Sequence, residues 1–190
     1  MIKILKQKNT GFTLVETLIA ISVFTMSIIA LMSVLASGIS NTNYAKNKMI
    51  ATYLAQEGIE YIHNIRDNYV LSDPTGWNDF NVKIEPCTNG NGCYFNDSSL
   101  GDAVMKDIQI AECTAGLCGL YYLPAEDIYT YNYNNSGENV SGFKRVITVD
   151  PNISSTGQEV KITSTVTWGN NSVKFSENLF NWVTEPVTAL

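Results

Sequence analysis

The sequence predicts an α+β fold, in which a long and partly membrane-spanning N-terminal helix packs on a C-terminal antiparallel β-sheet. Between Glu16 and Lys46, 29 consecutive residues carry no charge. Apolar residues then recur every three or four positions, and alternating segments typical of strands follow further on. The 190 residues accordingly divide into a leader, an apolar helical half, an amphipathic helical half, an irregular region and a sheet: 1–11, 12–37, 38–71, 72–142 and 143–190.

The uncharged segment is long enough to cross a membrane as a helix. Its 19 residues from Leu18 to Ala36 would extend roughly 28 Å, close to the thickness of the hydrocarbon core of a bilayer. Three lysines within residues 1–11 favour a cytoplasmic N-terminus and a head on the other side of the membrane. A secretory signal cut near Ser37 is the alternative, but the apolar run is longer than such signals usually are.

Glu16 places a carboxylate at the start of this apolar run, directly after the residues from Gly11 to Val15. An ionised group there costs free energy and should have a partner. If the chain is cut after Gly11, the new amine of Phe12 lies four residues before Glu16 and could neutralise it, in the same chain or in a neighbouring subunit. The alternative is that Glu16 extends to the lipid headgroups.

The basic leader, the residues from Gly11 to Glu16 and the apolar run together resemble the N-terminal signature of type IV prepilins and pseudopilins. The resemblance implies a pilin-like fold and a prepilin peptidase that cuts after Gly11 and methylates Phe12. It also implies that Phe12 and Glu16 act in assembly with other subunits. Filament-forming pilins commonly carry a proline in the apolar helix, whereas the first proline here is Pro74, which favours a minor pilin or a pseudopilin.

Residues 38–71 are expected to continue the helix with one apolar face. That face is formed by residues spaced three or four apart: Ala51, Leu54, Gly58, Ile62, Ile65 and Tyr69. Residues 53–60 and 64–67 also resemble a segment of minor pilins in the PilV-like group. Glu60 and His63 have a spacing that could hold a metal, but a lone histidine is more often a packing residue, so no metal site is expected.

Three segments near the C-terminus alternate apolar and polar residues, as strands do: 143–149, 160–168 and 173–177. Turn-forming residues separate them, including Gly169, Asn170 and Asn171 between the last two. An antiparallel meander is expected, with its apolar face on the amphipathic half of the helix. A further strand is expected near residues 120–123.

The four cysteines, Cys87, Cys93, Cys113 and Cys118, lie in the region expected to be irregular. They form two close pairs, which suits disulfides Cys87–Cys93 and Cys113–Cys118 in an oxidising compartment, although four cysteines allow three connectivities. A zinc site made by all four is the rival interpretation, but its usual C-x2-C knuckles are missing. Long loops of this kind commonly carry recognition.

The chain offers little catalytic chemistry. It has one histidine and no phosphate loop, nucleophile elbow or H-E-x-x-H motif, so neither an enzyme nor a cofactor is expected. A net charge of −6 without clustered cations argues against nucleic-acid binding by most of the head.

The function predicted from the sequence is that of a minor type IV pilin or pseudopilin in a pilus, a type II secretion system or a DNA-uptake pseudopilus. It would be a single-pass protein of the bacterial cytoplasmic membrane, and incorporation in a surface filament is a further option. Its expected partners are prepilin peptidase, other subunits and the membrane. A membrane-anchored extracellular binding or adhesion module is the alternative.

Overall fold

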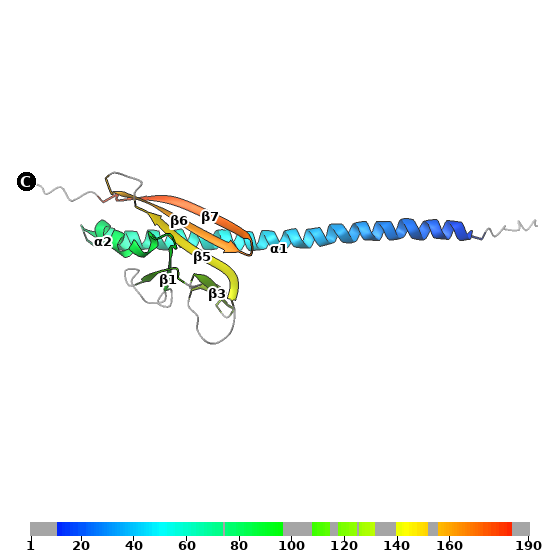
Figure 1. The fold of residues 1–190 in the computed structure, drawn as a ribbon, viewed down its shortest axis with the longest axis horizontal. Coiled ribbons are helices and arrows are strands. Elements are labelled where there is room, and N and C mark those ends of the chain that lie inside the picture. Colours follow the sequence, from blue (N-terminus) through cyan, green and yellow to red (C-terminus); the bar gives the residue numbers. More distant parts are fainter. Residues whose placement is uncertain are drawn as a thin grey trace, which may run out of the picture. The chain divides into compact units, whose positions relative to one another are not determined.

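The computed structural model describes most of the chain, in two compact units made of residues 1–46 and 47–190. The described residues are 11–73, 75–96, 108–114, 118–124, 126–131, 140–151 and 156–183. They form one long helix, a short helix, a 3-10 turn and an antiparallel sheet. The fold class is therefore α+β, with a long N-terminal apolar helix and a C-terminal antiparallel sheet (Figure 1).

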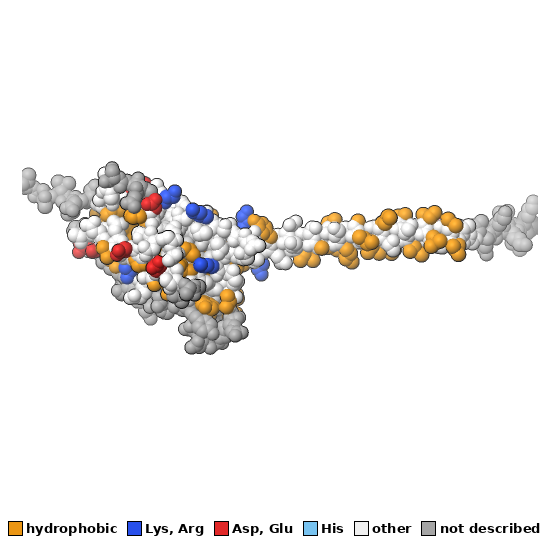
Figure 2. Space-filling model, viewed as in Figure 1, with side chains coloured by type: hydrophobic (Ala, Val, Ile, Leu, Met, Phe, Trp, Pro, Cys, Tyr) orange, Lys and Arg blue, Asp and Glu red, His pale blue; other side chains and the backbone are white. Residues whose placement is uncertain are grey.

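Helix α1 runs from Leu14 to Ser72. The part in the first unit is exposed throughout, and Figure 2 shows hydrophobic side chains along it. The unit ends at Lys46, which is also the first charged residue after Glu16. With no proline before Pro74, nothing in the chemistry of the backbone interrupts the helix.

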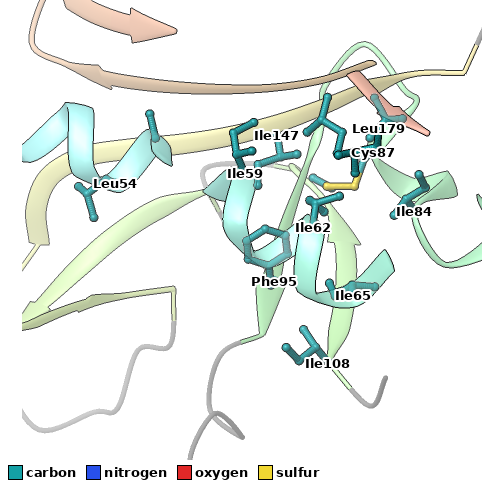
Figure 3. Packing of buried hydrophobic residues seen from close by; sticks show 14 of the residues in the cluster. Leu54, Ile59, Ile62, Ile65, Ile84, Cys87, Phe95, Ile108, Ile147 and Leu179 are labelled. Carbon is teal, nitrogen blue, oxygen red and sulfur yellow. A yellow bond between two sulfur atoms is a disulfide. The ribbon is translucent and has the colours of Figure 1, made fainter. Parts of the chain in front are cut away.

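The part of α1 in the second unit buries one face. The buried residues recur at helical spacing: Ala51, Leu54, Ala55, Gly58, Ile59, Ile62, Ile65 and Val70. All of them except Gly58 belong to the same core cluster as the apolar residues of the sheet. The prediction that the amphipathic half of the helix packs on the apolar face of the sheet is confirmed (Figure 3).

Three long strands form the main part of the sheet: β5 (Val140–Asp150), β6 (Glu159–Trp168) and β7 (Asn171–Phe180). They are antiparallel neighbours in chain order, as expected, and each is longer than its alternating segment because the ladder continues to the strand ends. Asn171 pairs with Trp168, so the turn between β6 and β7 is shorter than expected. Gly169 begins this turn at a φ of 52°, a conformation that glycine adopts without strain.

The region from residue 72 to 142 is more regular than expected. It contains helix α2 (Gly76–Lys83), the 3-10 turn η1 (Glu85–Cys87) and four strands, β1 (Cys93–Asn96), β2 (Gln109–Glu112), β3 (Gly119–Leu123) and β4 (Ile128–Thr130). Strand β3 lies where one additional strand was expected. The others were missed because they are very short, and pairing with distant strands stabilises them more than their own residue pattern does.

Strand β5 is central in the sheet, because it pairs with β1, β3 and β6. Its residue Ile147 pairs with Ser164 of β6 and with Cys93 of β1, which therefore lie on opposite edges of β5. Strand β3 pairs with the same edge as β1, where Gly119 lies opposite Lys144. Strands β2 and β4 extend the sheet from β1 and β3.

Candidate functional site

The first residues described, Gly11, Phe12 and Thr13, are exposed and precede α1. Thr13 caps the helix, because its Oγ1 accepts the N–H of Glu16 at 3.3 Å and its carbonyl accepts the N–H of Thr17 at 3.2 Å. The Thr-x-x-Glu pattern is a sequence signal for such a cap, so this helix start could have been predicted from residues 13–16. The peptide bond after Gly11 therefore lies in exposed, non-helical chain.

Glu16 is exposed in the first turn of α1 and makes no ion pair among the described residues. Phe12 precedes the helix, and in the uncleaved chain it has no free amine. The ion pair expected between the Phe12 amine and Glu16 therefore cannot form in the uncleaved chain. The rest of the leader, residues 1–10, lies outside the described residues.

Hydroxyl groups in the uncharged segment bond to the helix that carries them. Those of Thr17, Ser22, Thr25 and Ser27 donate to carbonyl oxygens three or four residues earlier, at 2.8 to 2.9 Å. An unpaired hydroxyl in hydrocarbon would cost free energy, so these bonds lower the cost of placing these four side chains in lipid. By length and composition, α1 could cross a membrane.

The cysteines form two local disulfides. Cys87 of η1 is bonded to Cys93 of β1, with 4.6 Å between their Cα atoms, and Cys113 after β2 is bonded to Cys118 before β3, with 5.6 Å. These are the two pairs expected from the sequence. Because all four sulfurs are in disulfides, none is a thiolate that could bind zinc.

A buried arginine links α1 to the sheet. Arg145 of β5 is 0% exposed. Its Nη1 donates to Glu57 Oε2 at 2.6 Å and to the Leu54 carbonyl at 3.1 Å. Its Nε donates to the Tyr131 hydroxyl at 2.8 Å, and the guanidinium carbon lies 4.8 Å from the centroid of that ring. One cation thus contacts the helix, the sheet and an aromatic ring.

The neighbours of Arg145 stabilise its protonated form. Burial alone would lower the pKa of its guanidinium, but the Coulombic and hydrogen-bond interactions with Tyr131 and Glu57 outweigh burial and raise the pKa. A buried cation needs such compensation. Arg145 Nη2 and the hydroxyl of Ser164 have no hydrogen-bond partner within the described part of the chain.

Gly58 of α1 lies directly against this network. A Cβ atom there would lie 2.7 Å from Ser164 Oγ and 3.2 Å from Arg145 Cδ. The absence of a side chain thus allows the helix backbone to approach the sheet. Gly58 was expected on the buried face of the helix, whereas the pairing of Arg145 with Glu57 was not predicted from the sequence. A signal for Arg145 was present, since it alternates with Phe143 and Ile147 in a strand whose inward positions are otherwise apolar.

His63 contacts the sheet. Its Nε2 lies 3.1 Å from Glu177 Oε1 of β7, within ion-pair distance but outside hydrogen-bond geometry. The carboxylate of Glu60 accepts a bond from Asn64 at 3.4 Å. Among the described residues, no three histidine, cysteine or acidic side chains are grouped so that they could hold a metal.

Two surface hollows adjoin at η1. One, of about 370 Å³, is lined by Asn81, Ile84, Glu85, Thr88, Pro151, Gly157 and Val160. The other, of about 410 Å³, is lined by Glu85, Pro86, Thr88, Asn89, Ala111 and Glu112. Both hollows include Glu85 and Thr88, and the second carries two carboxylates. Thr88 of the Cys87–Cys93 loop lines both hollows, and Asn89 lines the second.

No protein-family model matches the sequence, and neither a curated protein nor a solved structure matches it. The function is therefore argued from the residues and their geometry.

Proposed function

We propose that the chain is a minor type IV pilin or pseudopilin, a membrane-anchored subunit that joins other subunits through the N-terminal half of α1. One observation carries this proposal. Residues 17–45 form an uncharged and fully exposed segment of a helix that begins just after Gly11 and Phe12 and carries Glu16 in its first turn. Contact with lipid, or with equivalent helices of other subunits, would remove this apolar surface from water.

The magnitudes favour burial of the segment despite the charge of Glu16. More than a dozen large apolar side chains between Leu14 and Ile39 are exposed, and burying each contributes about 1.5–3 kcal/mol. A carboxylate at the centre of a membrane costs only about 2.5–3.5 kcal/mol by insertion scales, and less near the interface. The amine of Phe12 created by cleavage would offset that cost further.

The proposed location follows from the same features. The anchor would lie in the cytoplasmic membrane with the N-terminus inside, and the second unit would lie outside or in a surface filament. Two disulfides agree with an oxidising compartment for that unit. The hydrogen-bonded hydroxyls of the uncharged segment agree with a surrounding of hydrocarbon.

The test is the mass of the N-terminal peptide of membrane-extracted protein from cells that contain a prepilin peptidase. We expect a peptide that begins at methylated Phe12. As a control, Gly11→Leu should leave Met1 or the whole leader in place while the protein still reaches the membrane. An intact leader on the wild-type protein in those cells would contradict the proposal.

A membrane-anchored binding module is the second candidate, and the hollows beside the Cys87–Cys93 loop favour it. Replacing Glu85, Thr88 and Glu112 by alanine would alter the acidic hollow and leave both disulfides intact. If binding is the main function, this variant should still join the membrane assembly but lose attachment to the surface that the wild type binds. Equal attachment by the wild type and the triple variant would exclude a role of this hollow in binding.

A further inference from the structure

Two Asn-Gly pairs, Asn89–Gly90 and Asn91–Gly92, lie in the loop that the Cys87–Cys93 disulfide closes. Asparagine before glycine is prone to deamidation, because the unhindered backbone nitrogen of the glycine can attack the side-chain amide carbon. In a folded protein the attack requires that both groups can move toward each other. The two pairs differ in this respect.

Hydrogen bonds and close packing fix the pair Asn91–Gly92. Asn91 Nδ2 donates to Glu112 Oε1 at 2.9 Å, and the N–H of Gly92 donates to the carbonyl of Asn89 at 2.9 Å. Gly92 is buried at a φ of 67°, and a Cβ atom there would lie 2.6 Å from the carbonyl oxygen of Ile147. Both the amide and the attacking nitrogen are therefore fixed, in a backbone that has no room to move.

The pair Asn89–Gly90 is open. Both residues are exposed, and nothing lies within 4 Å of a Cβ atom placed on Gly90. Among the described residues, neither the amide of Asn89 nor the N–H of Gly90 is held by a hydrogen bond. Within the described ranges, the one hydrogen bond of this pair is accepted by the carbonyl of Asn89 from the N–H of Gly92, and it involves neither reacting group.

We propose that Asn89 is a site of spontaneous deamidation in the folded protein and that Asn91 is protected. The nitrogen of Gly90 loses its proton to hydroxide and bonds to Cγ of Asn89. The bond from Cγ to Nδ2 then breaks, and ammonia leaves with a proton from water, so that a succinimide ring remains. Water opens the ring at either carbonyl and gives aspartate or isoaspartate. No oxidant, reductant or enzyme is needed.

The product changes the surface at a defined place. Asn89 lines the hollow that also contains Glu85 and Glu112, so deamidation adds a third carboxylate there. The hollow becomes more acidic as the molecule ages, which favours cationic partners over anionic ones. This inference does not depend on the proposed function, because it concerns only the loop between Cys87 and Cys93.

The experiment uses the full chain, oxidised and solubilised in detergent, at mildly alkaline pH. Samples taken over time are digested, and fragment-ion mass spectrometry reports amide loss at each asparagine. We expect Asn89 to convert about tenfold faster than Asn91, because attack at Asn91 first requires the loss of hydrogen bonds, one of them to a carboxylate. Gly90→Ala should slow conversion at Asn89, and the open space around Gly90 allows that substitution without strain.

The reduced and denatured chain is the matched control. There the two asparagines have similar neighbours, and we expect similar rates. Faster conversion of Asn91 than of Asn89 in the folded chain would overturn the proposal. So would equal rates in the folded chain, because the structure would then give no protection. A rate at Asn89 that Gly90→Ala leaves unchanged would exclude attack by the Gly90 nitrogen.

Discussion

Arg145 depends on Glu57 and Tyr131 more than either of them depends on Arg145. Glu57 has a side chain that is 41% exposed and can be hydrated. The Tyr131 hydroxyl donates to the backbone carbonyl of residue 145, a bond that does not need the guanidinium. Arg145 itself is fully buried and has no access to water. Removing the carboxylate should therefore cost more than removing the cation.

The prediction is that Glu57→Ala lowers the free energy of unfolding by about 2 kcal/mol, a value reduced from that of a fully buried pair because Glu57 is partly hydrated. Arg145→Met, which keeps an unbranched apolar chain, should cost less. In the Arg145→Met protein, Glu57→Ala should cost almost nothing. Denaturant unfolding followed by tryptophan fluorescence reports the second unit, where all three tryptophans lie. Additive effects of the two substitutions would show that the pair is not coupled.

Tyr122 gives a pH-dependent prediction. Its pKa is raised from 10.0, mainly because its hydroxyl donates a hydrogen bond to Asp127 at 2.6 Å. A raised pKa in the folded state means that this bond contributes to stability below pH 10 and that the contribution is lost as the pH rises through the folded-state pKa. The tyrosinate absorbance of the wild type minus that of Tyr122→Phe should therefore have a midpoint above 10. Asp127→Asn should lower that midpoint, and an unchanged midpoint would exclude the carboxylate as the cause.

At the residue scale, the sequence predicts the groups that belong to a local motif and misses those that meet through the fold. The two disulfides were predicted because the cysteines of each pair are close along the chain. Gly11, Phe12 and Glu16 also form a local motif, and their roles stay predictions. Glu57 and Arg145 are 88 residues apart, and no local pattern connects them. The position of Arg145 among inward-facing residues was visible, but its partner was not.

At the element scale, the long elements were predictable because their residue patterns repeat several times. Helix α1 and strands β5 to β7 have this property. Strands β1 to β4 have three to five residues each and depend on pairing with β5 or with each other. In such short segments the alternation of apolar and polar residues is too brief to distinguish a strand from a loop, so that region was expected to be irregular.

Because α1 lies close to the sheet at Gly58 and has open space around Gly38, alanine substitutions at these two glycines should affect stability differently. Gly58→Ala should lower the free energy of unfolding by about 1–2 kcal/mol, because the overpacking against Ser164 and Arg145 exceeds the gain in helix propensity. Gly38→Ala meets nothing within 4 Å and should leave the unfolding of the second unit unchanged.

Denaturant titrations of both variants, with Ser164→Ala added to Gly58→Ala, provide the check. The added substitution removes the atom nearest to the new Cβ and should restore part of the loss. If Gly58→Ala were as stable as the wild type, the helix and the sheet would not be as close as described.

At the scale of the whole molecule, the chain consists of a unit whose described residues are all exposed and a unit with its own core and both disulfides. A fragment of residues 47–190 should therefore be soluble and monomeric without detergent, whereas the full chain should need detergent. Size-exclusion chromatography with light scattering measures both. Aggregation of the oxidised fragment, or a monomeric full chain in plain buffer, would contradict this division.

In the proposed function, the N-terminal half of α1 joins the protein to other subunits and Glu16 takes part. The most direct test compares the wild type with Glu16→Ala and with the neighbouring Thr17→Ala, after cross-linking in the native membrane and mass spectrometry of the purified complexes. We expect the wild type and Thr17→Ala to capture subunits whose precursors carry their own Gly-Phe-x-x-x-Glu sequence. Glu16→Ala should reach the membrane in equal amount and capture far fewer of them. Equal capture by all three proteins, or none by the wild type, would contradict the account.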